Sequence, residues 1–142
     1  MVKHSGKKLL RVVFSIDALM AIGFGLYSWL FPQDTFGTII AIPHNATSVF
    51  EAIFAVLSAF YMLIGFTCVI GILARFPENA WIGALMIIRH LSEATLKIFD
   101  MEAEWAIGNP WPDLIIHTLF IVAYSWSVIW TYANRSKESS GN

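Results

Sequence analysis

Four apolar runs fill most of this 142-residue chain, and each is close to the ~20 residues that a helix needs to cross ~30 Å of hydrocarbon. The runs cover about 9–31, 49–73, 80–99 and 113–133. Prolines and polar residues lie between them, where helices are expected to end. The pattern predicts an all-α fold in which residues 1–142 form a single domain, an integral membrane bundle of four transmembrane helices.

Composition agrees with a membrane location and excludes several classes of protein. Hydrophobic residues make up 57 % of the chain and charged residues 13 %, against roughly 45–50 % and 25 % in soluble domains. The nine Lys and Arg nearly balance the ten Asp and Glu, so the basic face that a nucleic-acid-binding protein needs is missing. A single cysteine, Cys68, excludes a disulfide framework and a cysteine-built metal site within the chain. The lipid bilayer is therefore the first partner expected, and nucleic acid is not one.

The distribution of basic residues predicts the orientation of the helices. Apart from two in the third run, all Lys and Arg lie near the N-terminus, between the second and third runs, or near the C-terminus: Lys3, Lys7, Lys8, Arg11, Arg75, Arg135 and Lys137. The connections 32–48 and 100–112 contain neither residue type. Because basic residues stay on the cytoplasmic side of a membrane, we expect both termini to be cytoplasmic. The chain is then a multi-pass protein of the cell inner (cytoplasmic) membrane.

The third run differs from the others because it carries four ionisable residues: Arg89, His90, Glu93 and Lys97. A charged residue costs roughly 2.5–3.5 kcal/mol at the centre of an inserted helix, so each should have a partner or a wet cavity. Arg89, Glu93 and Lys97 are spaced four residues apart, which places them on one helical face. That face is expected to turn away from lipid and toward the other helices.

One partner for this face is predicted in the first run. Asp17 is the only charged residue in the apolar part of that run, and it lies near the expected midplane, as Arg89 does. We therefore predict a structural ion pair between Asp17 and Arg89. Losing either partner would leave an unpaired buried charge, so the pair would fix how the two helices align.

A second polar group is expected in the outer half of the bundle. At ~1.5 Å per residue, similar depths are obtained for five residues from three runs: Glu51, Glu93, Lys97, Asp113 and His117. We predict that they converge with the residues of the third run. The candidates for catalysis are Glu93, His90 and His117, and those for ligand binding are Glu51, Arg89, Lys97 and Asp113.

Three interpretations of this outer cluster stay open. It is a solvated or packing network, a binding or acid–base site for a lipophilic molecule, or a metal site. Imidazole with carboxylate suits zinc, iron or manganese, but the di-iron bundles use Glu-x-x-His on each of two helices. Here the order is His-x-x-Glu, it occurs once, and Lys97 beside it opposes a cation. From the sequence we assign no metal ligands and name no cofactor.

Three short motifs carry a resemblance to a known family. The first run ends in Leu30–Phe31–Pro32, the third contains Arg89–His90, and the sequence from Asn109 to Asp113, NPWPD, leads into the fourth. In this and in its length, the chain resembles the DoxX-like group of small bacterial membrane proteins. The resemblance implies a four-helix membrane bundle, often without an assigned activity, with some relatives being subunits of quinone-linked oxidoreductases. No set of catalytic residues comes with it.

Two function hypotheses follow. The first is a non-catalytic one, an accessory or scaffold subunit, or a lipophilic-ligand-binding module, of a membrane complex. Its partners would be other membrane subunits or a second copy of the chain, and a lipid or quinone. The alternative is a membrane-embedded enzyme, of the isomerase or quinone-linked oxidoreductase type. It would perform acid–base chemistry on a hydrophobic substrate at the Glu93, His90 and His117 cluster.

Overall fold

The helices of the chain are longer than the apolar runs that predict them. The computed structural model describes residues 5–36, 47–101 and 109–139, and these contain helices and no strand. The elements are α1 (Ser5–Leu30), α2 (Pro32–Phe36), α3 (Thr47–Leu73), α4 (Glu78–Asp100) and α5 (Trp111–Ser139). The all-α prediction is confirmed, and a long helix covers each of the four predicted runs.

Local sequence explains where several helices begin. Pro32 is the first residue of α2 and Pro112 is the second residue of α5, and in the first turn of a helix a proline has no hydrogen bond to lose. At the start of α5, the Asn109 side-chain oxygen accepts a hydrogen bond from the backbone N–H of Trp111 (3.1 Å), as capping side chains do. The NPWPD motif is therefore a helix-start signal.

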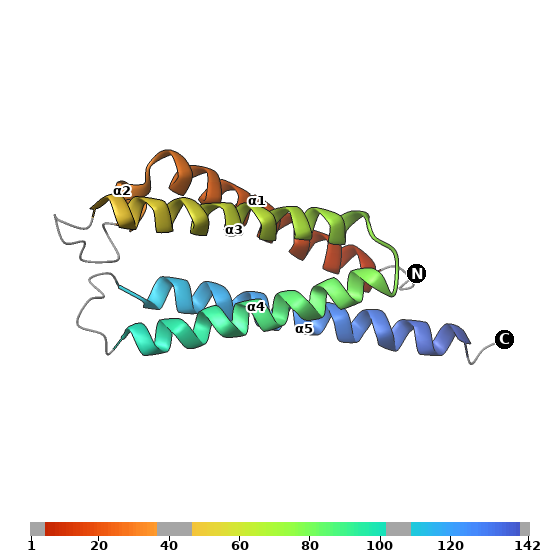
Figure 1. Cartoon of the computed structure of the whole chain (residues 1–142). Coiled ribbons are helices and arrows are strands. Elements are labelled where there is room, and N and C mark those ends of the chain that lie inside the picture. The colour runs from red at the N-terminus through yellow and green to blue at the C-terminus, as the bar shows by residue number, and fades with distance from the viewer. Residues whose placement is uncertain (1–4, 37–46, 102–108, 140–142) are drawn as a thin grey trace.

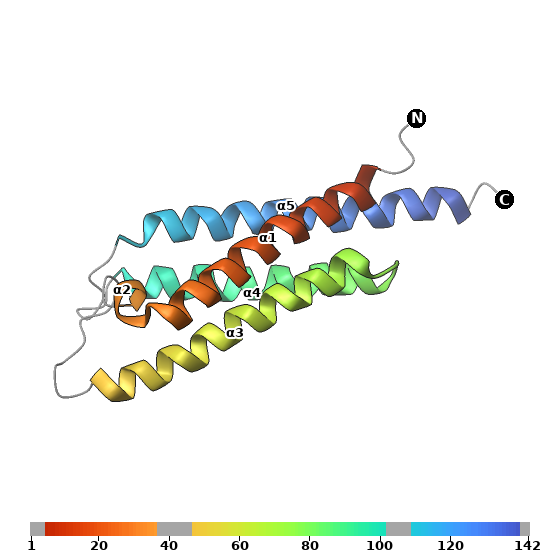
Figure 2. The same ribbon diagram turned by 90° about the horizontal axis from the view of Figure 1, so that it is seen from above.

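The four long helices form two pairs (Figure 1). The most extensive contacts join α1 to α3 and α4 to α5, while α1 with α5 and α3 with α4 link the pairs. Seen from above, α1 runs obliquely across the bundle, over α5 near its beginning and toward α3 at its end (Figure 2). The beginning of α1, the turn between α3 and α4 and the end of α5 lie at one end of the bundle in both views. The described segments that carry basic residues outside α4 are therefore gathered at that end.

Three of the long helices contain segments that are long and apolar enough to cross a membrane. These segments are Lys7–Leu30 in α1, Ser48–Leu73 in α3 and Trp111–Ala133 in α5. Among the described residues, α4 does not reach this level, because Arg89, Glu93 and Lys97 lower its hydropathy. The predicted four crossings are thus supported for three helices.

Glycines allow α1 and α3 to pack closely. A Cβ atom on Gly25 would lie 2.9 Å from the backbone oxygen of Ser58, and one on Gly65 would lie 3.2 Å from that of Ala18. The first distance is too short for a methyl group and the second is tighter than most real contacts, so both helices depend on small residues where they meet. The buried apolar core of the bundle consists of Leu10, Val13, Phe14, Ala18, Cys68, Met86, Phe120 and Tyr124.

Candidate functional site

Asp17 lies at the centre of the bundle and receives donors from three other helices. Its side chain is 2 % exposed. One carboxylate oxygen accepts from Arg89 Nη1 on α4 at 3.0 Å. The other accepts from the Tyr124 hydroxyl on α5 at 2.9 Å, and lies 3.1 Å from His90 Nε2 and 3.5 Å from the Cys68 thiol of α3. The carboxylate therefore ties α1 to every other long helix.

Arg89 bridges two carboxylates. While Nη1 contacts Asp17, Nη2 lies 2.9 Å from Glu93 Oε2, one turn further along α4. The guanidinium also lies over the ring of Tyr61 on α3, 5.9 Å from its centroid. The structure thus brings together the predicted pair of Asp17 and Arg89 and adds Glu93 as a second anion on the same cation.

His90 is held by an aromatic stack and by polar contacts with Asp17, His117 and Arg89, whose Nη1 lies 3.2 Å from His90 Nε2. Its ring is 1 % exposed and stacks on Phe120 of α5, with 4.6 Å between centroids and 6° between planes. Nε2 contacts Asp17, and Nδ1 faces His117 Nδ1 of α5 at 3.0 Å. Nε2 thus lies between Asp17 Oδ2, which accepts, and Arg89 Nη1, which can only donate. Because Arg89 Nη1 already donates to Asp17 Oδ1 at the shorter distance of 3.0 Å, we assign the hydrogen of the neutral ring to Nε2.

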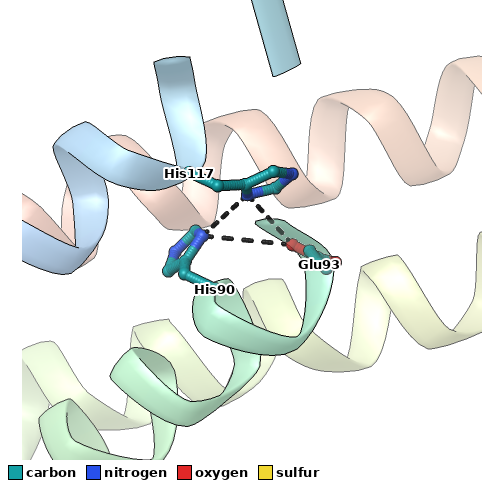
Figure 3. A group of neighbouring side chains, drawn as sticks. All are labelled: His90, Glu93 and His117. Carbon is teal, nitrogen blue, oxygen red and sulfur yellow. Dashed lines mark hydrogen bonds and ion pairs between the residues drawn. The ribbon is translucent and has the colours of Figure 1, made fainter. Parts of the chain in front are cut away.

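His90, Glu93 and His117 point toward one another (Figure 3). Glu93 Oε2 lies 3.1 Å from His117 Nδ1 and 3.9 Å from His90 Nδ1. Glu93 Oε2 is buried and has several nitrogens near it. None of the described residues, however, is aligned to donate a hydrogen bond to it. These are ion-pair contacts, and the oxygen keeps unused accepting capacity.

Exposure rises along a line of polar residues from the centre toward the end where α4 and α5 are joined. The side chain of Asp17 is 2 % exposed, that of Glu93 19 %, and that of Asp113 47 %. Lys97 forms an ion pair with Asp113 (3.3 Å) one turn beyond Glu93. Polar residues therefore continue, with rising exposure, from the buried centre toward that end of the bundle. We call Asp17, Arg89, His90, Glu93, His117 and Tyr124 the central network.

The predicted site residues separate into three places. Arg89, His90, Glu93 and His117 meet in the central network, and Lys97 and Asp113 form the pair beyond it. Glu51 does not join them, although its depth predicted that it would. It accepts a hydrogen bond from Gln33 of α2 (2.9 Å) and lies ten residues before Tyr61 on α3, about 15 Å along the helix axis. A depth along the membrane normal does not specify which side of a bundle a residue occupies.

Tyr124 and Cys68 are two contacts of Asp17 that were not predicted from the sequence. Tyr124 lies eleven residues after Asp113, about 16 Å deeper, which is the depth expected for Asp17. The same depth reckoning that paired Asp17 with Arg89 could therefore have found it. Cys68 had no such signal, because a cysteine in an apolar run is most often a small buried hydrophobic residue.

The charges of the central network do not balance. Two carboxylates face one guanidinium, and the remaining members, two imidazoles and a phenol, are neutral unless an imidazole takes up a proton. One hydrogen lies between the two facing Nδ1 atoms, since a hydrogen bond needs one donor and one acceptor. The network can thus exchange a proton or hold an added cation.

Comparisons with known proteins do not narrow these possibilities: no family model, no curated protein and no solved structure matches the chain.

Proposed function

We propose that this chain is a multi-pass membrane protein with four crossing helices whose central network binds a lipophilic molecule with a polar, proton-exchanging head group. A quinone is the chemical class that fits best, and the role is that of a ligand-binding or accessory subunit in a complex of an inner membrane. The observation that carries the proposal is the unbalanced network. Its Glu93 oxygen has accepting capacity beside its ion pair with Arg89, and polar residues continue from it toward the exposed end of the bundle.

A purely structural role explains less of this arrangement. The contact of Asp17 with Arg89 suffices to lock α1 to α4. Glu93, His90 and His117 extend it with further ionisable groups, each of which is costly to hold at membrane depth. Helix packing does not require these further groups. A polar head group that enters from the end near Asp113 does require them, because it needs ionisable partners along its way.

A second candidate function is an enzyme at the same place. Glu93 and His117 are within 3.1 Å of each other and are suited to pass a proton to and from a substrate. The resemblance to the DoxX-like group, some of whose members belong to quinone-linked oxidoreductases, fits both candidates and stays a prediction.

Binding to the full chain in lipid nanodiscs tests the proposal. The probe is a short-chain ubiquinone analogue, titrated while the fluorescence of the six tryptophans is recorded. We expect saturable quenching by the wild type and binding at least tenfold weaker for Glu93→Gln and His117→Gln. The matched control is Ser92→Ala, because Ser92 is the neighbour of Glu93 on the exposed side of α4 and bonds only to its own helix.

Two results would contradict the binding proposal. One is quenching that does not saturate, and the other is equal affinity for the wild type and both variants. Mass spectrometry of the probe and of co-purifying lipids after incubation separates the candidates, because only an enzyme would convert a molecule that it binds.

A further inference from the structure

The donor atoms of His90, Glu93 and His117 form a small triangle (Figure 3). Its sides are 3.0 Å between the two Nδ1 atoms, 3.1 Å from His117 Nδ1 to Glu93 Oε2, and 3.9 Å from that oxygen to His90 Nδ1. A circle through three points so spaced has a radius of about 2 Å, which matches the roughly 2.0–2.2 Å bonds from zinc to imidazole nitrogen and carboxylate oxygen. We propose that these three atoms are the protein ligands of a divalent transition-metal ion.

The hydrogen bonds of His90 prepare it as a ligand. Its Nε2 donates to Asp17, which leaves the lone pair of Nδ1 directed at the triangle. Asp17 is itself held by the Tyr124 hydroxyl and by Arg89. This is the carboxylate–histidine–metal arrangement by which metal sites fix the tautomer and the orientation of an imidazole. Packing against Phe120 holds the same ring plane.

The other two ligands each have capacity for the ion. Glu93 Oε2 is buried and no described residue is aligned to donate it a hydrogen bond, so it has lone-pair capacity for a metal beside its ion pair with Arg89. His117 gives up the hydrogen on the line between the two Nδ1 atoms, either to its own Nε2 or to solvent. A divalent ion then compensates the excess negative charge of the network.

Two cations close to the triangle do not prevent binding. Lys97 contacts Asp113 at 3.3 Å, so it has an anion of its own. Arg89 lies 2.9 Å from the Glu93 oxygen but also contacts Asp17 and Tyr61. A carboxylate has lone pairs for both a metal and a guanidinium, and Arg89 would then orient the ligand from outside the metal's own shell.

The donor set defines the class of metal. Two imidazole nitrogens and one carboxylate oxygen suit Zn²⁺ and Fe²⁺, and three protein ligands leave at least one coordination position open. In the sequence, a single His-x-x-Glu and the nearby Lys97 disfavoured a metal. The third ligand comes from a different helix, which is a fact of the tertiary structure.

Metal uptake by the full chain tests this inference independently of any lipophilic ligand. The protein carries no histidine tag, is stripped with a chelator in detergent, and is then incubated with Zn²⁺ alone. After dialysis we expect about one Zn²⁺ per chain by elemental analysis, and affinity at least tenfold weaker for Glu93→Gln and His117→Gln. The double variant His4→Gln/His44→Gln removes the other two histidines and should bind as the wild type does. Asp17→Asn should weaken binding by about 10–100-fold while leaving the ligands in place.

A second measurement needs no variant of the site. Cu²⁺ bound to the His4→Gln/His44→Gln protein should show, by pulsed electron paramagnetic resonance, the remote nitrogens of two imidazoles. Signals from two imidazoles support the site, and signals from one or none overturn it. Zn²⁺ uptake far below one per chain, or uptake that survives both ligand substitutions, would also overturn it. Quinone binding without metal uptake would leave the proposed function intact and refute only the metal site.

Discussion

Asp17 shows how one buried carboxylate can connect a whole bundle. It contacts donors on α3, α4 and α5 while lying on α1, so each of the four long helices contributes to its surroundings. The Arg89 guanidinium serves Asp17 and Glu93 together. The two carboxylates are therefore energetically coupled through one cation, and substitutions at either should not act independently.

The first prediction follows from this shared cation. Arg89→Leu should destabilise the detergent-solubilised protein more than Asp17→Asn does. The first substitution leaves two carboxylates without their guanidinium, whereas after the second Arg89 still forms its ion pair with Glu93. Breaking a buried pair from one side typically costs about 3–5 kcal/mol. The double variant should be less destabilised than the sum of the single variants, as measured by thermal unfolding in a double-mutant cycle. Additive effects would show that the two residues do not interact, and Ser92→Ala serves as the neutral reference on the same helix.

At the scale of the elements, α1 and α3 pack closely because their contact is lined with small residues. Gly25 faces the backbone of Ser58, whereas a Cβ atom added to Gly23, two residues earlier, would meet nothing within 4 Å. The two glycines share a helix and a sequence context but differ in what they face. They therefore separate the effect of packing from that of glycine's backbone freedom.

The second prediction uses this pair. Gly25→Ala should lower stability by about 1–3 kcal/mol, because the methyl group meets a backbone oxygen that cannot rotate away. Gly23→Ala should be neutral or raise stability by up to about 1 kcal/mol, since alanine is the better helix former. Thermal unfolding in the same detergent compares the two. Equal effects at both positions would mean that the α1–α3 contact is looser than described.

At the scale of the whole molecule, α4 decides the topology. Three helices are apolar enough to cross a membrane alone, and α4 carries the polar face of the central network. Packed against α5 and directed at Asp17, that face is covered by protein. A helix of this kind can cross a bilayer as part of a bundle, because its charges are paired within the protein.

The third prediction tests whether α4 crosses. With four crossings, reporters attached at the two ends of the chain lie on the same side, whereas three crossings would place them on opposite sides. We expect a reporter after Asn142 to read cytoplasmic, and one inserted near Asp34 or Glu104 to read external. Termini on opposite sides would refute the four-helix topology. A shared external side would instead refute the orientation drawn from the basic residues.

The order of residues along the chain is enough to predict the helical class, the four long helices and the types of side chain that must pair. Apolar runs of membrane length leave few folds open, since a buried backbone must satisfy its own hydrogen bonds. The pairing of Asp17 with Arg89 could also be predicted, because a lone charge in an apolar run needs a partner at its own depth. These inferences depend only on the position of each residue along its own helix, and that position can be read from the sequence.

Which residues at one depth become neighbours could not be predicted, because it depends on how the helices pack. Glu51 and His117 were both predicted for the outer half, yet one lies by α2 and the other faces Glu93. Which residues face one another depends on how each helix is rotated about its axis and on which helices are its neighbours. Both follow from the packing of the complete bundle. The same packing turned Tyr124 toward Asp17 and set His90, Glu93 and His117 around one point. Convergence of groups from separate helices is a property of that packing and cannot be obtained from spacing along any single run.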